Sequence, residues 1–263
     1  MRLINVHSDE LKGVFPEQEP PYAILSHVWD GRNEKIVGAC QQAINDNLGW
    51  LWCDTNCIDK TSSAELTEAI SNMFAWYTKS QVCYAYLDDV DIPPPRATRS
   101  SGSAGLKKNA EENNLALANT EHVQPLFAKS RWFTRGWTLQ ELLAPSREVF
   151  FAKDWTALGD RNQLSRSISD IARIHIGALR DRSTIWQYSV AQRMSWAADR
   201  QTIRREDVAY CLLGIFNIHM PMLYGEGLAL SRGYSEQLSR LRMTRVFLPG
   251  AWMMRRPSPV LGH

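Results

Sequence analysis

Apolar and polar positions follow two different periods in the first third of the chain. Short apolar runs at 20–30, 48–54 and 81–89 predict buried strands. Between them, segments 34–47 and 62–80 repeat apolar side chains every three or four positions, as amphipathic helices do. This β-α-β-α-β order predicts an α/β fold in which parallel strands form a sheet flanked by helices.

The pattern changes after the third predicted strand. Residues 91–120 are rich in proline, serine, glycine, asparagine and charge, which predicts an exposed and flexible insertion. A helix is then predicted from about Thr134 to Leu143, where Pro145 ends it. Residues 147–154 predict a fourth strand.

Beyond residue 155 the apolar positions keep helical spacing, so three parts are expected. Residues 1–155 form the α/β core with its insertion. Residues 156–242 form a mostly helical extension packed on that core. Residues 243–263 show no clean period and are expected to form a poorly ordered tail.

The composition is that of an ordinary globular protein, with 44% hydrophobic and 22% charged residues. A net charge of +2 provides no electrostatic drive toward nucleic acid or an anionic membrane. No apolar run approaches the roughly 18 residues that a membrane span needs, and an odd number of cysteines follows an N-terminus without a secretory signal. We therefore expect a cytoplasmic protein with reduced thiols, no membrane span and no nucleic-acid partner.

Candidate chemistry gathers where the predicted strands end. In a doubly wound sheet, ligands bind beyond the carboxyl ends of the strands. Three segments would reach that edge: the residues after the first strand, those after the second, and the helix that follows the insertion. Their polar and aromatic side chains are Ser26, His27, Trp29, Asp54, Trp137 and Glu141.

Three of these residues also have an ordinary structural interpretation. His27 could end its strand and bond a loop carbonyl, and Asp54 could cap the turn after its strand. Glu141 could be a solvated helix charge. Its neighbours in sequence are leucines, however, and Trp137 lies one turn back. A carboxylate beside an indole in a cleft is a setting that perturbs acidity and marks functional sites.

Metal and nucleotide motifs are weak in this sequence. Cys53 and Cys57 have C-x3-C spacing without a second pair, which argues against a zinc site. The sequence contains no G-x-G-x-x-G, P-loop or G-x-S-x-G motif. A hydrolase that uses Cys53 or Cys57 with His27 is a lower-ranked alternative, because no local signature supports it.

Three ordered blocks carry a resemblance to a known family. They are YAILSHVW at 22–29, WLWCDTNCIDK at 50–60 and SRWFTRGWTLQELLAP at 130–145. Together they resemble the HET domain, the heterokaryon-incompatibility domain of filamentous fungi. A fourth segment, 204–227, is similar to the stretch that follows the core in many HET proteins, whereas the sequence after about residue 228 departs from it.

The resemblance implies a fold and a catalytic residue. HET domains are thought to be relatives of TIR domains, which implies a flavodoxin/TIR-like sheet. TIR domains that cleave NAD carry their essential glutamate in a W-C-x-x-E-L helix, and residues 137–142 read WTLQEL. By this resemblance Glu141 is the catalytic carboxylate, and Thr138 replaces the cysteine of the motif.

With NAD as the substrate, the surrounding residues also have expected roles. Trp29 or Trp137 would stack on nicotinamide or adenine, and Arg131 or Arg135 would hold the pyrophosphate. The expected pocket lining is Ser26, His27 and Asp54. NAD is the expected substrate, and neither a cofactor nor a metal is expected.

Two functions remain open at this level. The first is an NAD-cleaving effector of heterokaryon (vegetative) incompatibility and programmed cell death, which self-associates through HET–HET contacts and responds to a nucleotide-binding receptor. The second is a non-catalytic, self-associating signalling module. Loss of NAD cleavage on changing Glu141 would distinguish the two.

Overall fold

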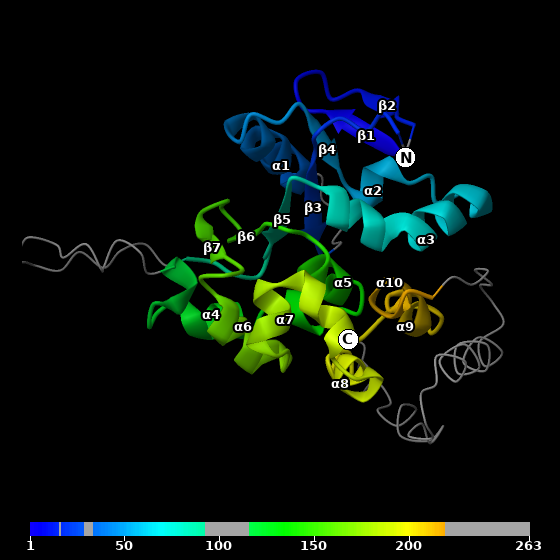
Figure 1. The fold of residues 1–263 in the computed structure, drawn as a ribbon. Coiled ribbons are helices and arrows are strands. Elements are labelled where there is room, and N and C mark those ends of the chain that lie inside the picture. The colour runs from blue at the N-terminus through cyan, green and yellow to red at the C-terminus, as the bar shows by residue number, and fades with distance from the viewer. Residues whose placement is uncertain (16, 29–33, 93–115, 219–263) are drawn as a thin grey trace, which may run out of the picture.

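The computed structural model describes residues 1–15, 17–28, 34–92 and 116–218. Within these residues, seven strands form one sheet in the order β2-β1-β4-β3-β5-β6-β7 (Figure 1). The strands are β1 Arg2–Asn5, β2 Leu11–Gly13, β3 Ala23–His27, β4 Trp50–Trp52, β5 Val82–Tyr86, β6 Glu148–Phe151 and β7 Ala157–Asp160.

The four predicted strands form the parallel centre of the sheet. β3 pairs in parallel with β4 and β5, and β5 pairs in parallel with β6. The first predicted strand therefore lies between the second and the third, which is the strand order of flavodoxin-like folds. The α/β fold class, with parallel strands flanked by helices, is confirmed.

The edges of the sheet differ from the prediction of a purely parallel sheet. β1 and β2 form an antiparallel hairpin beside β4, and β7 pairs antiparallel with β6. These strands have three or four residues each. Strands this short contain too few alternating apolar and polar positions to be recognised from the sequence. Strand β7 also shows that the part after residue 155, which is expected to be mostly helical, begins with a strand of the sheet.

Two helices follow the first two central strands and lie on opposite faces of the sheet. They are α1, Glu34–Asn45, and α3, Ser63–Lys79 (Figure 1). Right-handed crossovers that run in opposite directions along the sheet require this arrangement. Ser62 caps α3 by accepting a hydrogen bond from the Glu65 backbone amide. The Glu65 carboxylate instead contacts Arg2 and the Asp59 amide, so only half of a capping box forms.

The helix predicted from about Thr134 to Leu143 is wrong in its first half. A 3-10 turn covers Arg131–Thr134, and α5 covers only Thr138–Leu143. Gln201 explains the break, because its amide donates to Thr134 O at 2.6 Å and its carbonyl accepts from Gly136 N at 2.8 Å. Thr134 and Gly136 thus form backbone hydrogen bonds with a distant segment instead of within a helix. The local sequence pattern gives no sign of this tertiary pairing.

Mostly short helices follow the sheet in the described part of the chain and pack on it. They are α6 Ser165–Ala172, α7 Ile176–Arg180, the 3-10 helix η4 Arg182–Gln187, α8 Val190–Ser195, α9 Asp207–Tyr210 and α10 Leu213–Phe216. One apolar cluster joins Leu142 of α5, Leu179 of α7 and Ile215 of α10. Helix α10 packs against α3, where Gly214 lies against the Phe74 side chain. The boundary at residue 155 remains a prediction.

The predicted insertion corresponds mostly to residues outside the description. Of residues 91–120, only 91–92 and 116–120 are described. Ala116 and Ala118 are buried, and a 3-10 turn covers Leu117–Asn119, so this end belongs to the packed core rather than to an exposed loop. The predicted tail at 243–263 lies wholly outside the described residues. In the part that is described, no helix is long and apolar enough to span a lipid bilayer.

Candidate functional site

Glu141 lies in the middle of α5 and is buried, with 7% of its surface exposed. Every residue of this helix is buried, so the helix has no solvated face. The Ser26 hydroxyl, near the carboxyl end of β3, donates a hydrogen bond to Glu141 Oε2 at 2.5 Å. The same hydroxyl accepts from Trp132 Nε1 at 2.8 Å. Two hydrogen bonds therefore fix the serine that orients the carboxylate.

The electrostatic setting makes Glu141 an unusual acid. Its pKa is raised to about 8, chiefly because burial disfavours the charged form. The negative charge of Asp54 acts in the same direction. The hydrogen bond from Ser26, the nearby Tyr77 hydroxyl and the positive charge of Arg200 act in the opposite direction. A carboxyl group that titrates near neutral pH at a strand-end site is a candidate for chemistry.

Arg200 is a site residue that the sequence did not reveal. It is half-buried, and desolvation by the surrounding protein lowers its pKa to about 10. Its Nη1 donates to Arg135 O at 2.9 Å and to Thr138 Oγ1 at 2.8 Å. The guanidinium therefore holds the first turn of α5 and brings a positive charge toward Glu141. Arg200 follows α8 in an irregular segment, so periodicity gives no signal for it.

Tyr77 and Trp132 are two further residues that sequence reasoning did not assign to the site. Tyr77 belongs to the apolar face predicted for α3, and an aromatic side chain on such a face is ordinarily core. Trp132 is buried in the 3-10 turn before α5. The signal that was available for Trp132 is its place within the third motif block, at 130–145.

His27, Cys53 and Asp54 form a second group beside Glu141. The His27 side chain is 2% exposed, and its Nδ1 lies 4.0 Å from Asp54 Oδ1. The Asp54 side chain is 42% exposed, so this group reaches solvent through Asp54. Cys53 is fully buried, and its Sγ lies 2.9 Å from Thr55 Oγ1.

Cys53 is poorly suited to act as a nucleophile. Burial and the charge of Asp54 raise the pKa of its thiol well above the ordinary value, so the thiolate is disfavoured. Burial likewise raises the pKa of Cys57 to about 12. The site geometry therefore gives no support to the alternative of a cysteine-dependent hydrolase.

Arg131 and its acidic partners lie at the carboxyl end of β5. Arg131 Nη2 contacts both carboxylate oxygens of Asp88, at 3.0 and 2.9 Å, and its backbone amide donates to Asp89 at 2.8 Å. Lys35 also lies 3.4 Å from Asp88. A pyrophosphate would compete with these carboxylates for Arg131, so the predicted anion-binding role requires exchange of partners.

The remaining predicted residues lie around α5. Trp137 is half-buried at the start of the helix, and its Nε1 donates to Asp207 Oδ2 at 3.2 Å. Arg135 is also half-buried, in the extended stretch before the helix. Trp29 lies outside the described residues. The predicted residues that the structure brings together are thus Ser26, His27, Asp54 and Glu141.

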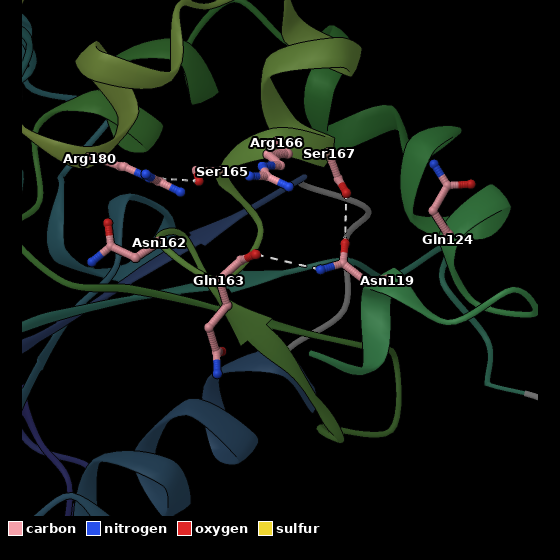
Figure 2. A pocket seen from close by; sticks show the side chains of 8 residues that line it. All are labelled: Asn119, Gln124, Asn162, Gln163, Ser165, Arg166, Ser167 and Arg180. Carbon is pink, nitrogen blue, oxygen red and sulfur yellow. Dashed lines mark hydrogen bonds between the residues drawn. The ribbon is translucent and has the colours of Figure 1, made fainter. Parts of the chain in front are cut away.

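A separate polar pocket of about 550 Å³ lies where α6 and α7 meet the 3-10 turn at 117–119 (Figure 2). Its lining includes Asn119, Asn162, Gln163, Ser165, Arg166 and Arg180. Hydrogen bonds tie several of these side chains to the wall, among them Ser167 to Asn119 at 2.6 Å and Arg180 to Ser165 at 3.1 Å. None of the predicted site residues lines this pocket.

Comparison with known proteins agrees with the motif blocks. Residues 22–141 match the family described as "Heterokaryon incompatibility protein (HET)", and the match ends on Glu141. Over 227 residues, or 79% of the chain, the sequence is 41% identical to "Vegetative incompatibility protein HET-E-1" of Podospora anserina, and the aligned region spans 15% of that protein. No solved structure matches the chain. The motifs, the matched region and this relative together show that the chain carries a HET, or heterokaryon-incompatibility, domain at residues 22–141.

Proposed function

We propose that this chain acts in heterokaryon incompatibility as a HET-domain effector that cleaves the nicotinamide–ribose bond of NAD. The observation that carries the proposal is the buried Glu141 carboxylate, held by Ser26 beside the carboxyl ends of the central parallel strands. Doubly wound sheets bind ligands at that edge. The WTLQEL stretch, similar to the glutamate motif of NAD-cleaving TIR domains, supports the same residue.

One carboxylate is enough for this reaction. Ordinary glycosidases need a general acid because a sugar alkoxide is a poor leaving group. Nicotinamide is a cationic ring in NAD and leaves as a neutral molecule with the electron pair of the C–N bond, so no proton has to be supplied. Water then attacks the ribose carbon and releases one proton, which gives ADP-ribose. The protein has to stabilise the oxocarbenium charge that develops on the ribose.

Glu141 is placed to provide that stabilisation. As an anion in a site shielded from water, it opposes a developing positive charge more strongly than an exposed carboxylate would. The hydrogen bond from Ser26 keeps the carboxylate in one orientation, so little reorganisation is needed during the reaction. The anionic form predominates above a pH of about 8. A cationic nicotinamide riboside moiety would favour the anion at lower pH as well, because opposite charges stabilise each other.

The proposal is tested by incubating concentrated protein with NAD and measuring nicotinamide release. The wild type should release nicotinamide, and Glu141→Gln should not, although it keeps the size of the side chain. Glu148→Gln is the matched control, because Glu148 is also a buried glutamate whose pKa burial raises well above the ordinary value. Release by a folded Glu141→Gln variant would exclude this carboxylate as the catalytic group.

A non-catalytic, self-associating module is the second candidate, and exposed apolar side chains favour it. Phe15, Val37 and Ile203 are 75%, 71% and 82% exposed. Under this alternative, sedimentation velocity would show assembly that is unchanged by Glu141→Gln but lost on Val37→Asp. The two candidates are separable, because the first requires nicotinamide release and the second does not.

A further inference from the structure

Three side chains of metal-ligating types converge at the carboxyl ends of β3 and β4. His27 ends β3, and Cys53 and Asp54 directly follow β4. One ligand atom from each residue lies within 4.8 Å of the other two. Asp54 Oδ1 is 4.0 Å from both His27 Nδ1 and Cys53 Sγ.

We propose that His27, Cys53 and Asp54 form a binding site for a divalent transition metal of the zinc class. In a tetrahedral zinc site, the ligand atoms are about 3.4 to 3.6 Å apart, as the usual metal–ligand distances require. The separations between these atoms therefore need to close by only a fraction of an ångström to about one ångström. Rotation of the half-exposed Asp54 side chain can close its own two separations, whereas the separation between the His27 and Cys53 ligand atoms requires a small shift of those two side chains. The proposal goes beyond the proposed function and does not depend on it.

The chemistry of the three ligands selects the class of metal. A thiolate and an imidazole favour zinc and similar first-row ions, whereas magnesium and calcium prefer oxygen ligands throughout. Binding would displace the Cys53 proton to solvent, because the thiolate is the ligand. A thiolate and a carboxylate would then balance the two positive charges of the ion. Three protein ligands leave the fourth position open, as in zinc sites that keep a water or a small ligand.

The spacing of the cysteines in the sequence did not indicate that His27, Cys53 and Asp54 lie together. The C-x3-C spacing of Cys53 and Cys57, without a second pair, argued against a zinc site. In the structure, Cys57 Sγ accepts a hydrogen bond from the Cys53 amide and lies near Leu51 O, so it is occupied within its own loop. The ligand that joins Cys53 and Asp54 is instead His27, which the parallel pairing of β3 with β4 brings alongside.

The test is to titrate the full chain with cobalt(II), which substitutes for zinc and absorbs when a thiolate binds it. The wild type should develop a thiolate-to-cobalt charge-transfer band that saturates at one ion per chain. Zinc should abolish the band, and excess magnesium should not. Cys53→Ser should remove it. Cys40→Ser is the matched control, since Cys40 is a buried cysteine on α1 outside the ligand group, and it should retain the band.

Asp54→Asn keeps the test decisive if the buried cysteine variant does not fold. Asp54 is half-exposed, so this change should leave the fold intact. It should weaken cobalt binding by more than the roughly 10- to 100-fold that loss of an outer-shell partner costs. A folded wild type without the band would overturn the proposal, as would a band that persists in Cys53→Ser or an affinity unchanged in Asp54→Asn. None of these readouts uses NAD, so failure of the metal site and failure of the proposed activity are distinguishable.

Discussion

The Ser26 hydroxyl and the Glu141 carboxylate are joined by a 2.5 Å hydrogen bond across 115 positions of sequence. The bond connects the central strand β3 to helix α5, so the sheet itself positions the candidate catalytic group. Because Ser26 also accepts from Trp132, its hydroxyl is held between the indole and the carboxylate. The orientation of Glu141 therefore depends on a residue from the first motif block, at 22–29, as well as on its own helix.

Replacing Ser26 with alanine should change both acidity and stability. The hydrogen bond favours the charged carboxylate, so its loss should raise the pKa of Glu141 further. The acid limb of the pH profile for nicotinamide release should then move to higher pH. The Trp132 indole would also lose its acceptor, which costs about 1–3 kcal/mol of unfolding free energy. A variant with an unchanged pH profile would show that Ser26 does not tune the acid.

The raised pKa of Glu141 predicts a pH-dependent stability. The folded pKa of about 8 lies above the ordinary value of 4.5, so the folded state holds this proton more tightly than the unfolded state does. Stability from this group is complete below the unfolded pKa and is lost as the pH rises through the folded one. The loss is about 1.4 kcal/mol for each pH unit between the two values.

Urea unfolding of the wild type and of Glu141→Gln across this pH range checks that slope. The glutamine variant cannot titrate at this position, so its stability should fall less steeply as the pH rises. Parallel pH dependences for the two proteins would mean that Glu141 titrates normally. In that case the desolvated setting described for the carboxylate would be wrong.

A side chain at Gly136 should disturb the packing, because a Cβ atom there would lie 2.5 Å from Thr202 Cγ2. Gly136→Ala should therefore destabilise the protein by about 1–3 kcal/mol, the usual cost of overpacking. It should also loosen the backbone pairing of Gly136 with Gln201. Gly49→Ala is the control, since a Cβ there meets nothing within 4 Å. Thermal unfolding of the two variants should separate them clearly.

The same region explains how far sequence reasoning could reach. The central strands and helices α1 and α3 follow periods that are decided locally, so their patterns predicted them. The start of α5 was not predicted from its local pattern, because Gln201 pairs with the backbone at Thr134 and Gly136 from 65 or more positions away along the chain. The sequence could indicate Glu141 through its motif, but it could not show the tertiary contacts that determine its acidity.

Side chains that come from distant segments were the hardest part of the site to predict. His27 and Cys53 were each recognised as candidates, but their proximity depends on the pairing of β3 with β4. Arg200 was not recognised, because a single arginine in an irregular segment carries no pattern. Such residues can be assigned to the site only once the structure places them beside residues that the sequence motifs had indicated.

Replacing Arg200 with methionine tests whether the segment after α8 supports the site. The change removes hydrogen bonds to Arg135 O and Thr138 Oγ1, which should cost roughly 1–3 kcal/mol of stability. It also removes a positive charge that lowers the pKa of Glu141, so the acid limb of nicotinamide release should move to higher pH.

Arg182→Met separates the two effects of the Arg200 substitution. Arg182 Nη1 donates two similar hydrogen bonds, to Thr78 O and Ala144 O at 2.9 Å each, but its charge is not among the principal influences on the pKa of Glu141. This control should lose comparable stability and keep the wild-type pH profile. If both variants shifted the profile equally, Arg200 would act only through general packing; a shift confined to Arg200→Met would identify it as a residue that positions and tunes the candidate catalytic carboxylate.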